Sequence, residues 1–245
     1  MEKKGKSDDA VFLPTLVPGM DKMITNGGIR RGDVVVIRGE SGSGKSIFCF
    51  QSLYNAALGG ENVVYICFGE SSKKVKENMK SNFGLDIEKL EGDGKFKLID
   101  LNPSQFASEV EEALAKNKAG MEQDAVLKLP SKVDRVVLDS LSAVSDSFTH
   151  RIYYREYLDL IFSRIEAKNA IGFAIVERGG CGDVSEGPEN YMADGVFVLY
   201  NLKKEKDRVR ALEVTKLRCS NHLKNTVPFK ITDRGIEVYP KESVF

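Results

Sequence analysis

One short segment of the chain combines glycines, a lysine and hydroxyl side chains at a spacing that suits phosphate binding. It consists of Gly39, Glu40, Ser41, Gly42, Ser43, Gly44, Lys45 and Ser46. Glycines let a backbone fold closely around an anion because they lack a Cβ atom. We expect loop N–H groups and Lys45 to contact the phosphates, and the Ser46 hydroxyl to be a magnesium ligand. The segment predicts a site for Mg²⁺ and ATP, although these residues do not distinguish ATP from GTP.

The neighbouring sequence has the pattern that such a loop requires. The apolar run Val34–Arg38 precedes it and predicts a buried strand. Ile47–Leu58 follows and predicts a helix, which Gly59 and Gly60 would end. A strand, a loop and a helix in this order are the context in which this motif binds phosphate.

A candidate second magnesium ligand follows another apolar run. Arg135–Leu138 predicts a strand, and Asp139 comes directly after it. Ligands of an open parallel sheet bind at the carboxyl ends of its strands, so Asp139 should face the same crevice as Lys45. There it would orient Mg²⁺, through water. An aspartate at a strand end is more often a cap or turn residue, but the phosphate loop upstream favours the metal role.

Two glutamates also follow predicted strands. Glu70 comes after Val63–Phe68, where its carboxylate could take a proton from the water that attacks the γ-phosphate. The alternative is a glutamate stabilised by the dipole of a helix starting near Ser71. Glu177 follows Ile171–Val176 and could sense the γ-phosphate or pair with Arg178. The sequence does not separate these two roles for Glu177.

The remaining pattern predicts one α/β domain over residues 12–245, after a disordered tail at 1–11. The fold class is a mostly parallel central sheet flanked by helices, with C-terminal antiparallel strands. Further helices are predicted near 71–82, 103–116 and 152–168, and a further strand at Phe96–Leu101. Three late strands, expected to be largely antiparallel, are Gly195–Leu202, Arg208–Arg218 and Pro228–Tyr239.

The amino-acid composition limits which cell compartment and which kinds of partner suit this protein. Lys plus Arg and Asp plus Glu both number 36, so no global field attracts nucleic acid. No signal peptide is evident and the apolar runs are too short to cross a bilayer, which predicts a cytoplasmic protein without a membrane partner. The four cysteines form no C-x-x-C pair, and Cys49 and Cys67 lie in apolar stretches typical of buried positions.

A series of short segments, in order along the chain, adds to the phosphate loop. They are Gly19-Met20-Asp21, Gly27–Asp33, Phe68-Gly69-Glu70-Ser71, Leu138-Asp139-Ser140-Leu141, Ala193-Asp194-Gly195-Val196, Lys216-Leu217-Arg218, Phe229-Lys230-Ile231 and Gly235–Val238. With these segments the chain resembles single-domain, archaeal-type KaiC-like ATPases of the RecA/RadA superfamily over about residues 12–240.

The resemblance implies a RecA-like core and a homo-oligomer, a hexameric ring with ATP between subunits. It also implies that Lys216 and Arg218 reach the γ-phosphate of the neighbouring subunit. Without it, the two would be alternate residues on one face of a strand, typical of a solvated basic surface. KaiC-type domains usually carry paired glutamates where this chain has Gly69-Glu70, and circadian KaiC has two such domains, so a clock role is not carried over.

Three functions remain open at this stage. The first, which we favour, is slow ATP hydrolysis coupled to a conformational change or to an unidentified protein partner. The others are a recombinase-like nucleic-acid module that uses ATP for assembly, and a nucleotide-sensing regulator with little turnover. Nucleic acid is not favoured, because the predicted loop Arg178–Asn190 is acidic. One aromatic and basic patch could still bind a single strand, although a helix start at a subunit interface is the preferred interpretation: His150, Arg151, Tyr153, Tyr154 and Arg155.

Overall fold

The computed structural model describes residues 10–116, 127–177, 187–204 and 207–244. The predicted disordered tail therefore lies outside the described residues except for Ala10 and Val11. Val11 is tied to the fold, because its carbonyl oxygen accepts a hydrogen bond of 2.9 Å from the Arg31 N–H. Most of the predicted acidic loop, residues 178–186, also lies outside the described part.

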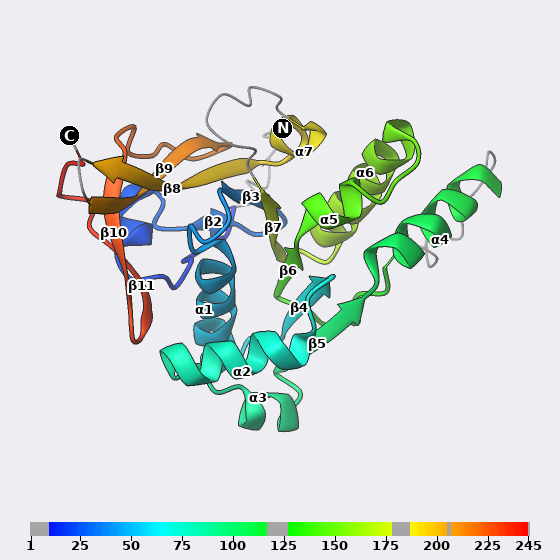
Figure 1. Ribbon diagram of the computed structural model, residues 1–245, viewed down its shortest axis with the longest axis horizontal. Helices are drawn as coiled ribbons and strands as arrows, with labels where there is room; N and C mark the ends of the chain where they lie inside the picture. The colour runs from blue at the N-terminus through cyan, green and yellow to red at the C-terminus, as the bar shows by residue number, and fades with distance from the viewer. Residues whose placement is uncertain (1–9, 117–126, 178–186, 205–206, 245) are drawn as a thin grey trace, which may run out of the picture.

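The described chain forms a nine-stranded sheet in the order β11-β10-β9-β8-β3-β7-β6-β4-β5 (Figure 1). The six strands from β8 to β5 run parallel, and β9, β10 and β11 add antiparallel pairs. The strands are β3 (Val34–Gly39), β4 (Val63–Phe68), β5 (Phe96–Leu101), β6 (Arg135–Asp139), β7 (Ile171–Glu177), β8 (Gly195–Lys204), β9 (Asp207–Leu217), β10 (Val227–Thr232) and β11 (Gly235–Val238). The predicted fold class is confirmed.

Helices cover both faces of this sheet because its central strands are apolar on both sides. The helices are α1 (Lys45–Leu58), α2 (Ser72–Phe83), α3 (Glu88–Gly92), α4 (Pro103–Lys116), α5 (Leu141–Ser145), α6 (Arg151–Ala167) and α7 (Pro188–Met192). One core packs α1, α2 and α3 against one face, and a second core packs α4, α5 and α6 against the other. Side chains along β3 point to the two cores in turn. Val35 and Ile37 belong to the first core, and Val34 and Val36 belong to the second.

Buried polar contacts tie the amino ends of the strands together. The Arg135 side chain is fully buried and forms a two-pronged ion pair with Glu61, with N···O distances of 2.7 and 3.0 Å. It also donates to the Pro14 carbonyl oxygen at 2.9 Å. Arg135 thus connects β6 to the turn between α1 and β4 and to the N-terminal segment. That segment carries β1 (Phe12–Leu13), a 3-10 helix η1 (Met20–Met23) and β2 (Ile29–Arg30).

Several predicted elements differ from the structure. Pro228–Tyr239 is not one strand, because the chain turns back at Asp233 and Arg234 and forms the β10–β11 hairpin. Gly235 has a φ of 100°, which favours glycine at this tight turn. The expectation that the late strands are largely antiparallel is confirmed by the β8–β9, β9–β10 and β10–β11 pairs, and β8 also pairs parallel with β3. The short helices α3, α5 and α7 and the β1–β2 pair were not expected, since segments of two to five residues show too little periodicity.

Two findings concern the membrane and cysteine expectations. No helix in the described ranges is both long and apolar enough to span a bilayer. Cys49 and Cys67 are buried, as predicted, and burial raises the pKa of the Cys67 thiol to about 12. Cys219 is exposed, and Cys181 lies among residues that the structure does not describe.

Candidate nucleotide site

The predicted phosphate loop connects β3 to α1 at the carboxyl edge of the sheet. Gly44 precedes α1 with a φ of 106°, a conformation that side chains with a Cβ atom rarely adopt. At Gly39 the constraint is space, because a Cβ atom there would lie 2.4 Å from the Leu199 carbonyl oxygen on β8. Since α1 begins at Lys45, the first N–H groups of this long helix have no partners within the helix and suit an anion.

Lys45 is held inside the loop. Its ammonium donates hydrogen bonds to the carbonyl oxygens of Gly39 and Glu40 at 3.0 and 2.9 Å. Only 6% of the residue is exposed. Burial lowers the pKa of Lys45, while the carboxylates of Glu177 and Asp139 act in the opposite direction. The loop therefore keeps a positive charge in a poorly solvated position, where a phosphate would be attracted strongly.

Asp139 ends β6 on the same edge of the sheet. The Tyr65 hydroxyl donates to its carboxylate Oδ2, so Tyr65 on β4 fixes the carboxylate beside the phosphate loop. Burial raises the pKa of the Asp139 carboxyl, and hydrogen bonds from Tyr65 and Ser46 oppose this effect. The hydrogen bond to Ser46 places the two predicted magnesium ligands next to each other.

The two glutamates stand at the mouth of the site. Glu70 follows Gly69 beyond β4, its side chain is 51% exposed, and its carboxylate lies 3.7 Å from the Lys74 ammonium. Glu177 ends β7, and its N–H donates to the Ser142 hydroxyl at 2.8 Å. The predicted pairing of Glu177 with Arg178 lies outside the described residues.

One cavity of about 420 Å³ joins these groups. Its lining includes loop residues Ser41, Gly42, Gly44, Lys45 and Ser46 together with Glu70, Asp139 and Glu177. Among the described residues no group of three or more His, Cys, Asp or Glu could hold a metal alone. Hydroxyl and carboxylate oxygens beside a phosphate loop do suit Mg²⁺, which usually takes one or two protein ligands, phosphate oxygens and water. The donor set therefore fits Mg²⁺ with a nucleotide.

Lys216 and Arg218 lie away from this cavity. Strand register shows why: Gly39, where the loop begins, pairs with Leu199 of β8, whereas Lys216 pairs with Val196, three residues nearer the amino end of β8. Lys216 belongs to β9 and Arg218 follows it. Both side chains contact the chain around the end of α7, so the structure brings these two cations together but not with their own phosphate loop.

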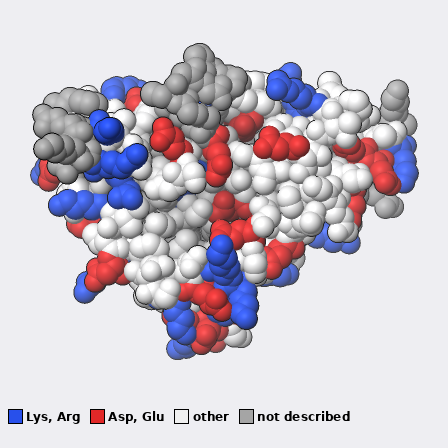
Figure 2. All heavy atoms as spheres, viewed as in Figure 1, with Lys and Arg blue, Asp and Glu red and all other residues white. Residues whose placement is uncertain are grey.

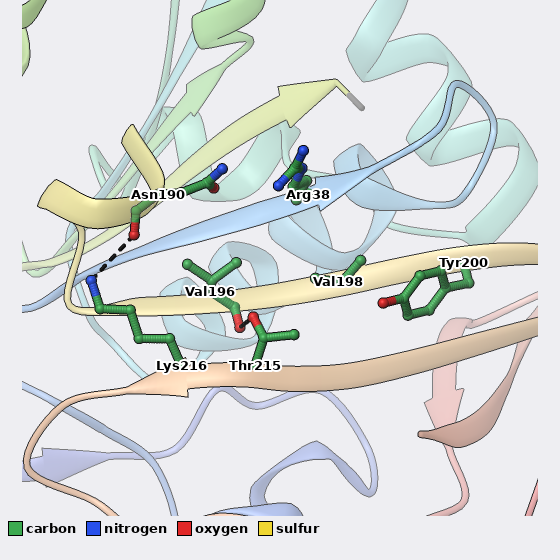
Figure 3. A pocket seen from close by; sticks show the side chains of 7 residues that line it. All are labelled: Arg38, Asn190, Val196, Val198, Tyr200, Thr215 and Lys216. Atoms are coloured by element: carbon green, nitrogen blue, oxygen red, sulfur yellow. Dashed lines mark hydrogen bonds between the residues drawn. The ribbon is translucent and has the colours of Figure 1, made fainter. Parts of the chain in front are cut away.

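A second cavity, of about 330 Å³, lies over β3, β8 and β9 (Figure 3). Arg38 and Asn190 line one side of it, Val196 and Val198 its floor, and Tyr200, Thr215 and Lys216 the other side. Arg38 is the arginine that the sequence places nearest the phosphate loop. Its position on β3 sends its side chain to the α6 face, into this second cavity.

The aromatic and basic patch at the start of α6 is smaller than its sequence suggests. Tyr154 is only 3% exposed and packs near Phe148, so it cannot stack on a base. Arg155 lies over the exposed ring of Tyr191 at 5.6 Å from its centroid. Figure 2 shows Lys and Arg side chains gathered at the left end of the view, over the β8–β10 end of the sheet, and Asp and Glu side chains across the middle.

Comparison with known proteins identifies the family of this chain. A family model described as "ATPase: KaiC" matches residues 13–243. The chain belongs to the KaiC ATPase family. Circadian clock oscillator protein KaiC from Synechococcus elongatus is 30% identical over 93% of this chain and 44% of its own length. Circadian clock protein KaiC3 from Synechocystis is 31% identical over 98% of this chain and 48% of its own. The chain thus spans about half the length of these relatives.

A solved structure supports the same family and fold. A KaiC-like protein from the hyperthermophilic archaeon Pyrococcus horikoshii OT3 has a TM-score of 0.76 and 27% identity, covering 94% of this chain and all of that one. Within this KaiC-family site, sequence reasoning missed Tyr65 and the β10–β11 hairpin. A Cβ atom added to Gly44 would lie 3.2 Å from Ile231 Cδ1 and 3.3 Å from Ile236 Cδ1 of that hairpin. In the sequence, Tyr65 and the two isoleucines have the pattern of ordinary apolar strand residues, which gives no sign of a place beside the site.

Proposed function

We propose that residues 12–245 form one domain that binds Mg-ATP and hydrolyses it slowly, within a homo-oligomeric ring. The observation that carries this proposal is the single cavity that joins Lys45, Ser46, Asp139 and Glu70 at the start of α1. Family membership supports ATPase chemistry, and the donor set fits the metal and the phosphates.

Each residue has a role in this proposal. Lys45 and the loop N–H groups would bind the phosphates. Ser46, and Asp139 through water, would hold Mg²⁺, which would offset negative charge on the transferred group. Glu70 takes a proton from water as the water oxygen bonds to the γ-phosphorus. The bond from that phosphorus to the ADP oxygen breaks, and ADP and phosphate leave. Turnover is slow because one carboxylate, half exposed and paired with Lys74, is only loosely positioned.

We further propose that the site is completed in trans by Lys216 and Arg218 of an adjacent subunit in a hexameric ring. Phosphoryl-transfer sites commonly add a cation, and an arginine supplied in trans contributes about 10³-fold or more. The distance along the sheet between these residues and their own phosphate loop supports this arrangement.

Replacing Lys45 tests the nucleotide site itself. Lys45→Ala should abolish Mg-ATP binding in titration calorimetry while the protein remains folded by circular dichroism. Lys74→Ala is a suitable control, because Lys74 is an exposed lysine at the cavity mouth. Wild-type affinity of Lys45→Ala would disprove the proposed site.

Mixing two inactive variants tests the trans arrangement. Arg218→Ala keeps a good phosphate loop, and Lys45→Ala keeps a good donor arginine. Turnover should reappear when the two exchange subunits, as verified by native mass spectrometry. Mixed rings without activity, or full activity of Arg218→Ala alone, would contradict it.

A nucleotide-sensing regulator with little turnover is a second candidate. The ion pair of Glu70 with Lys74 favours it, because the Lys74 ammonium competes with an attacking water molecule for the carboxylate. Partner proteins captured in ATP but not in ADP would support this function, and hydrolysis that depends on Glu70 would count against it.

A further inference from the structure

The segment Asn190–Asp194, which we call the cradle, binds both proposed trans cations. The Lys216 ammonium donates to the carbonyl oxygens of Asn190, Tyr191 and Ala193 at 3.2, 3.0 and 2.6 Å (Figure 3 shows the first). Arg218 donates to the Tyr191 carbonyl oxygen at 3.2 Å and forms an ion pair of 3.2 Å with Asp194. An ammonium has three N–H donors, so the cradle can occupy all of those of Lys216.

Arg218 is held differently from Lys216. Its guanidinium has five N–H donors, and the cradle contacts account for two nitrogen atoms. Its side chain is 51% exposed. An arginine anchored at one edge and exposed at the other can meet a phosphate without losing its anchor. A lysine would have to exchange carbonyl oxygens for the phosphate.

Asp194 is the charged member of the cradle and has two functions to serve. Its Oδ2 accepts a hydrogen bond of 3.0 Å from the Val34 N–H, at the start of the strand that leads to the phosphate loop. Its Oδ1 binds Arg218, and its carbonyl oxygen accepts the Arg218 N–H at 2.8 Å. One residue therefore touches both the strand of the subunit's own loop and the cation offered to a neighbour.

We infer that Asp194 is a positioning residue for Arg218, orienting its guanidinium toward the nucleotide of the adjacent subunit. This inference rests on the proposed trans arrangement. A long side chain loses conformational freedom when it is ordered, and a carboxylate that orders it beforehand reduces that loss at the reacting phosphate. Asp194 thus serves the donor side of the interface more than its own phosphate loop.

Mixing variants in one ring distinguishes a role on the arginine-donating side of the interface from a role on the phosphate-loop side. Asp194→Asn keeps an oxygen that can accept the Val34 N–H bond but removes the charge that holds Arg218. We expect turnover to fall by roughly tenfold to a hundredfold, the range for a modest misplacement of a catalytic group. Mg-ATP affinity should stay unchanged. Mixed with Lys45→Ala, the variant should regain turnover, and mixed with Arg218→Ala it should not.

A matched control exists on the same edge of the sheet. Asp134 likewise binds an arginine, Arg31 at 3.0 Å, and a backbone N–H, that of Asn62 at 2.9 Å. Asp134→Asn should leave turnover unchanged. Should Asp194→Asn fail to fold, Asp194→Ser replaces it, because its hydroxyl can also accept an N–H bond.

The outcomes separate this inference from the trans proposal. If Lys45→Ala and Arg218→Ala complement each other but the Asp194 variant is rescued by Arg218→Ala, the residue serves its own loop and the inference is wrong. If Lys45→Ala and Arg218→Ala do not complement, both ideas fail. Adding Asp194→Asn to Arg218→Ala should cost no further turnover, since residues acting through one contact are not additive, and a further loss would overturn the inference.

Discussion

At the scale of single residues, the site combines a buried cation with carboxylates in unequal surroundings. Asp139 is fixed by Tyr65 and buried, whereas Glu70 is half exposed and contacts Lys74. Metal binding suits the fixed carboxylate. Proton transfer suits the half-exposed carboxylate, because a water molecule can reach it.

Glu70→Gln tests the proton-transfer role. The amide keeps the shape and hydrogen bonding of glutamate but cannot accept the proton as a carboxylate does. We expect unchanged Mg-ATP binding and a loss of turnover on the order of 10²-fold or more, measured by phosphate release. Glu177→Gln is the matched comparison in the same cavity. Should Glu70→Gln hydrolyse ATP at the wild-type rate, the base lies elsewhere and Glu177 becomes the candidate.

Asp139→Asn separates stability from function. Burial disfavours the charged carboxylate and raises its pKa, so a neutral side chain of the same size removes that cost at neutral pH. The amide oxygen can still accept the Tyr65 hydroxyl. We expect the nucleotide-free variant to be at least as stable as the wild type in urea, with much weaker Mg²⁺-dependent turnover. A destabilised variant would show that the negative charge supports the fold.

At the scale of elements, Lys216 has a local task besides any trans role. It binds three carbonyl oxygens at the end of the five-residue helix α7. Removing hydrogen bonds from a charged donor costs about 1–3 kcal/mol. Lys216→Ala should therefore lower the free energy of unfolding by about that amount, whereas Arg218→Ala should change it little. Equal stabilities in denaturant titrations would contradict this difference.

The elements also show how far the sequence leads. Long, apolar or strongly periodic segments such as β3, β4 and α6 are predicted to within one or two residues, because burial sets both their pattern and their structure. The partners of Lys216 are not predictable, since they are backbone carbonyl oxygens of α7. Alternation along the sequence indicates that Lys216 and Arg218 lie on one side of the sheet. It does not indicate the β-bulge between Val196 and Phe197, which shifts the register of β8 and β9.

The site shows the same limit. Gly39–Ser46 and the strand-terminal Asp139 can be located from local pattern, because their chemistry depends on neighbours in sequence. Tyr65 contacts Asp139 across 74 residues, and a tyrosine within an apolar strand gives no sign of that contact. The catalytic roles of Glu70, Lys216 and Arg218 stay predictions.

At the scale of the whole molecule, charge distribution bears on nucleic acid. Net charge is zero, and Tyr154 of the predicted patch is buried. Few phosphate contacts mean weak and sequence-independent binding. We expect a labelled single-stranded oligonucleotide to bind weakly or not at all at physiological salt, with or without ATP. Salt-sensitive submicromolar binding would favour the recombinase-like function and Arg155 with Tyr191 as its surface.

The separation of Arg218 from its own phosphate loop has a consequence for stoichiometry. A subunit that offers Arg218 on one side and its phosphate loop on another forms a heterologous contact. Such contacts close into a ring or continue as an open row of subunits. In an open row of subunits, the phosphate loop at one end has no Arg218 from a neighbour. The Arg218 at the other end has no neighbouring phosphate loop. Under the proposed trans arrangement, only a closed ring gives every chain a complete site. Turnover per chain should then fall on dilution, while the affinity of each chain for nucleotide changes much less, so that assembly itself sets the rate.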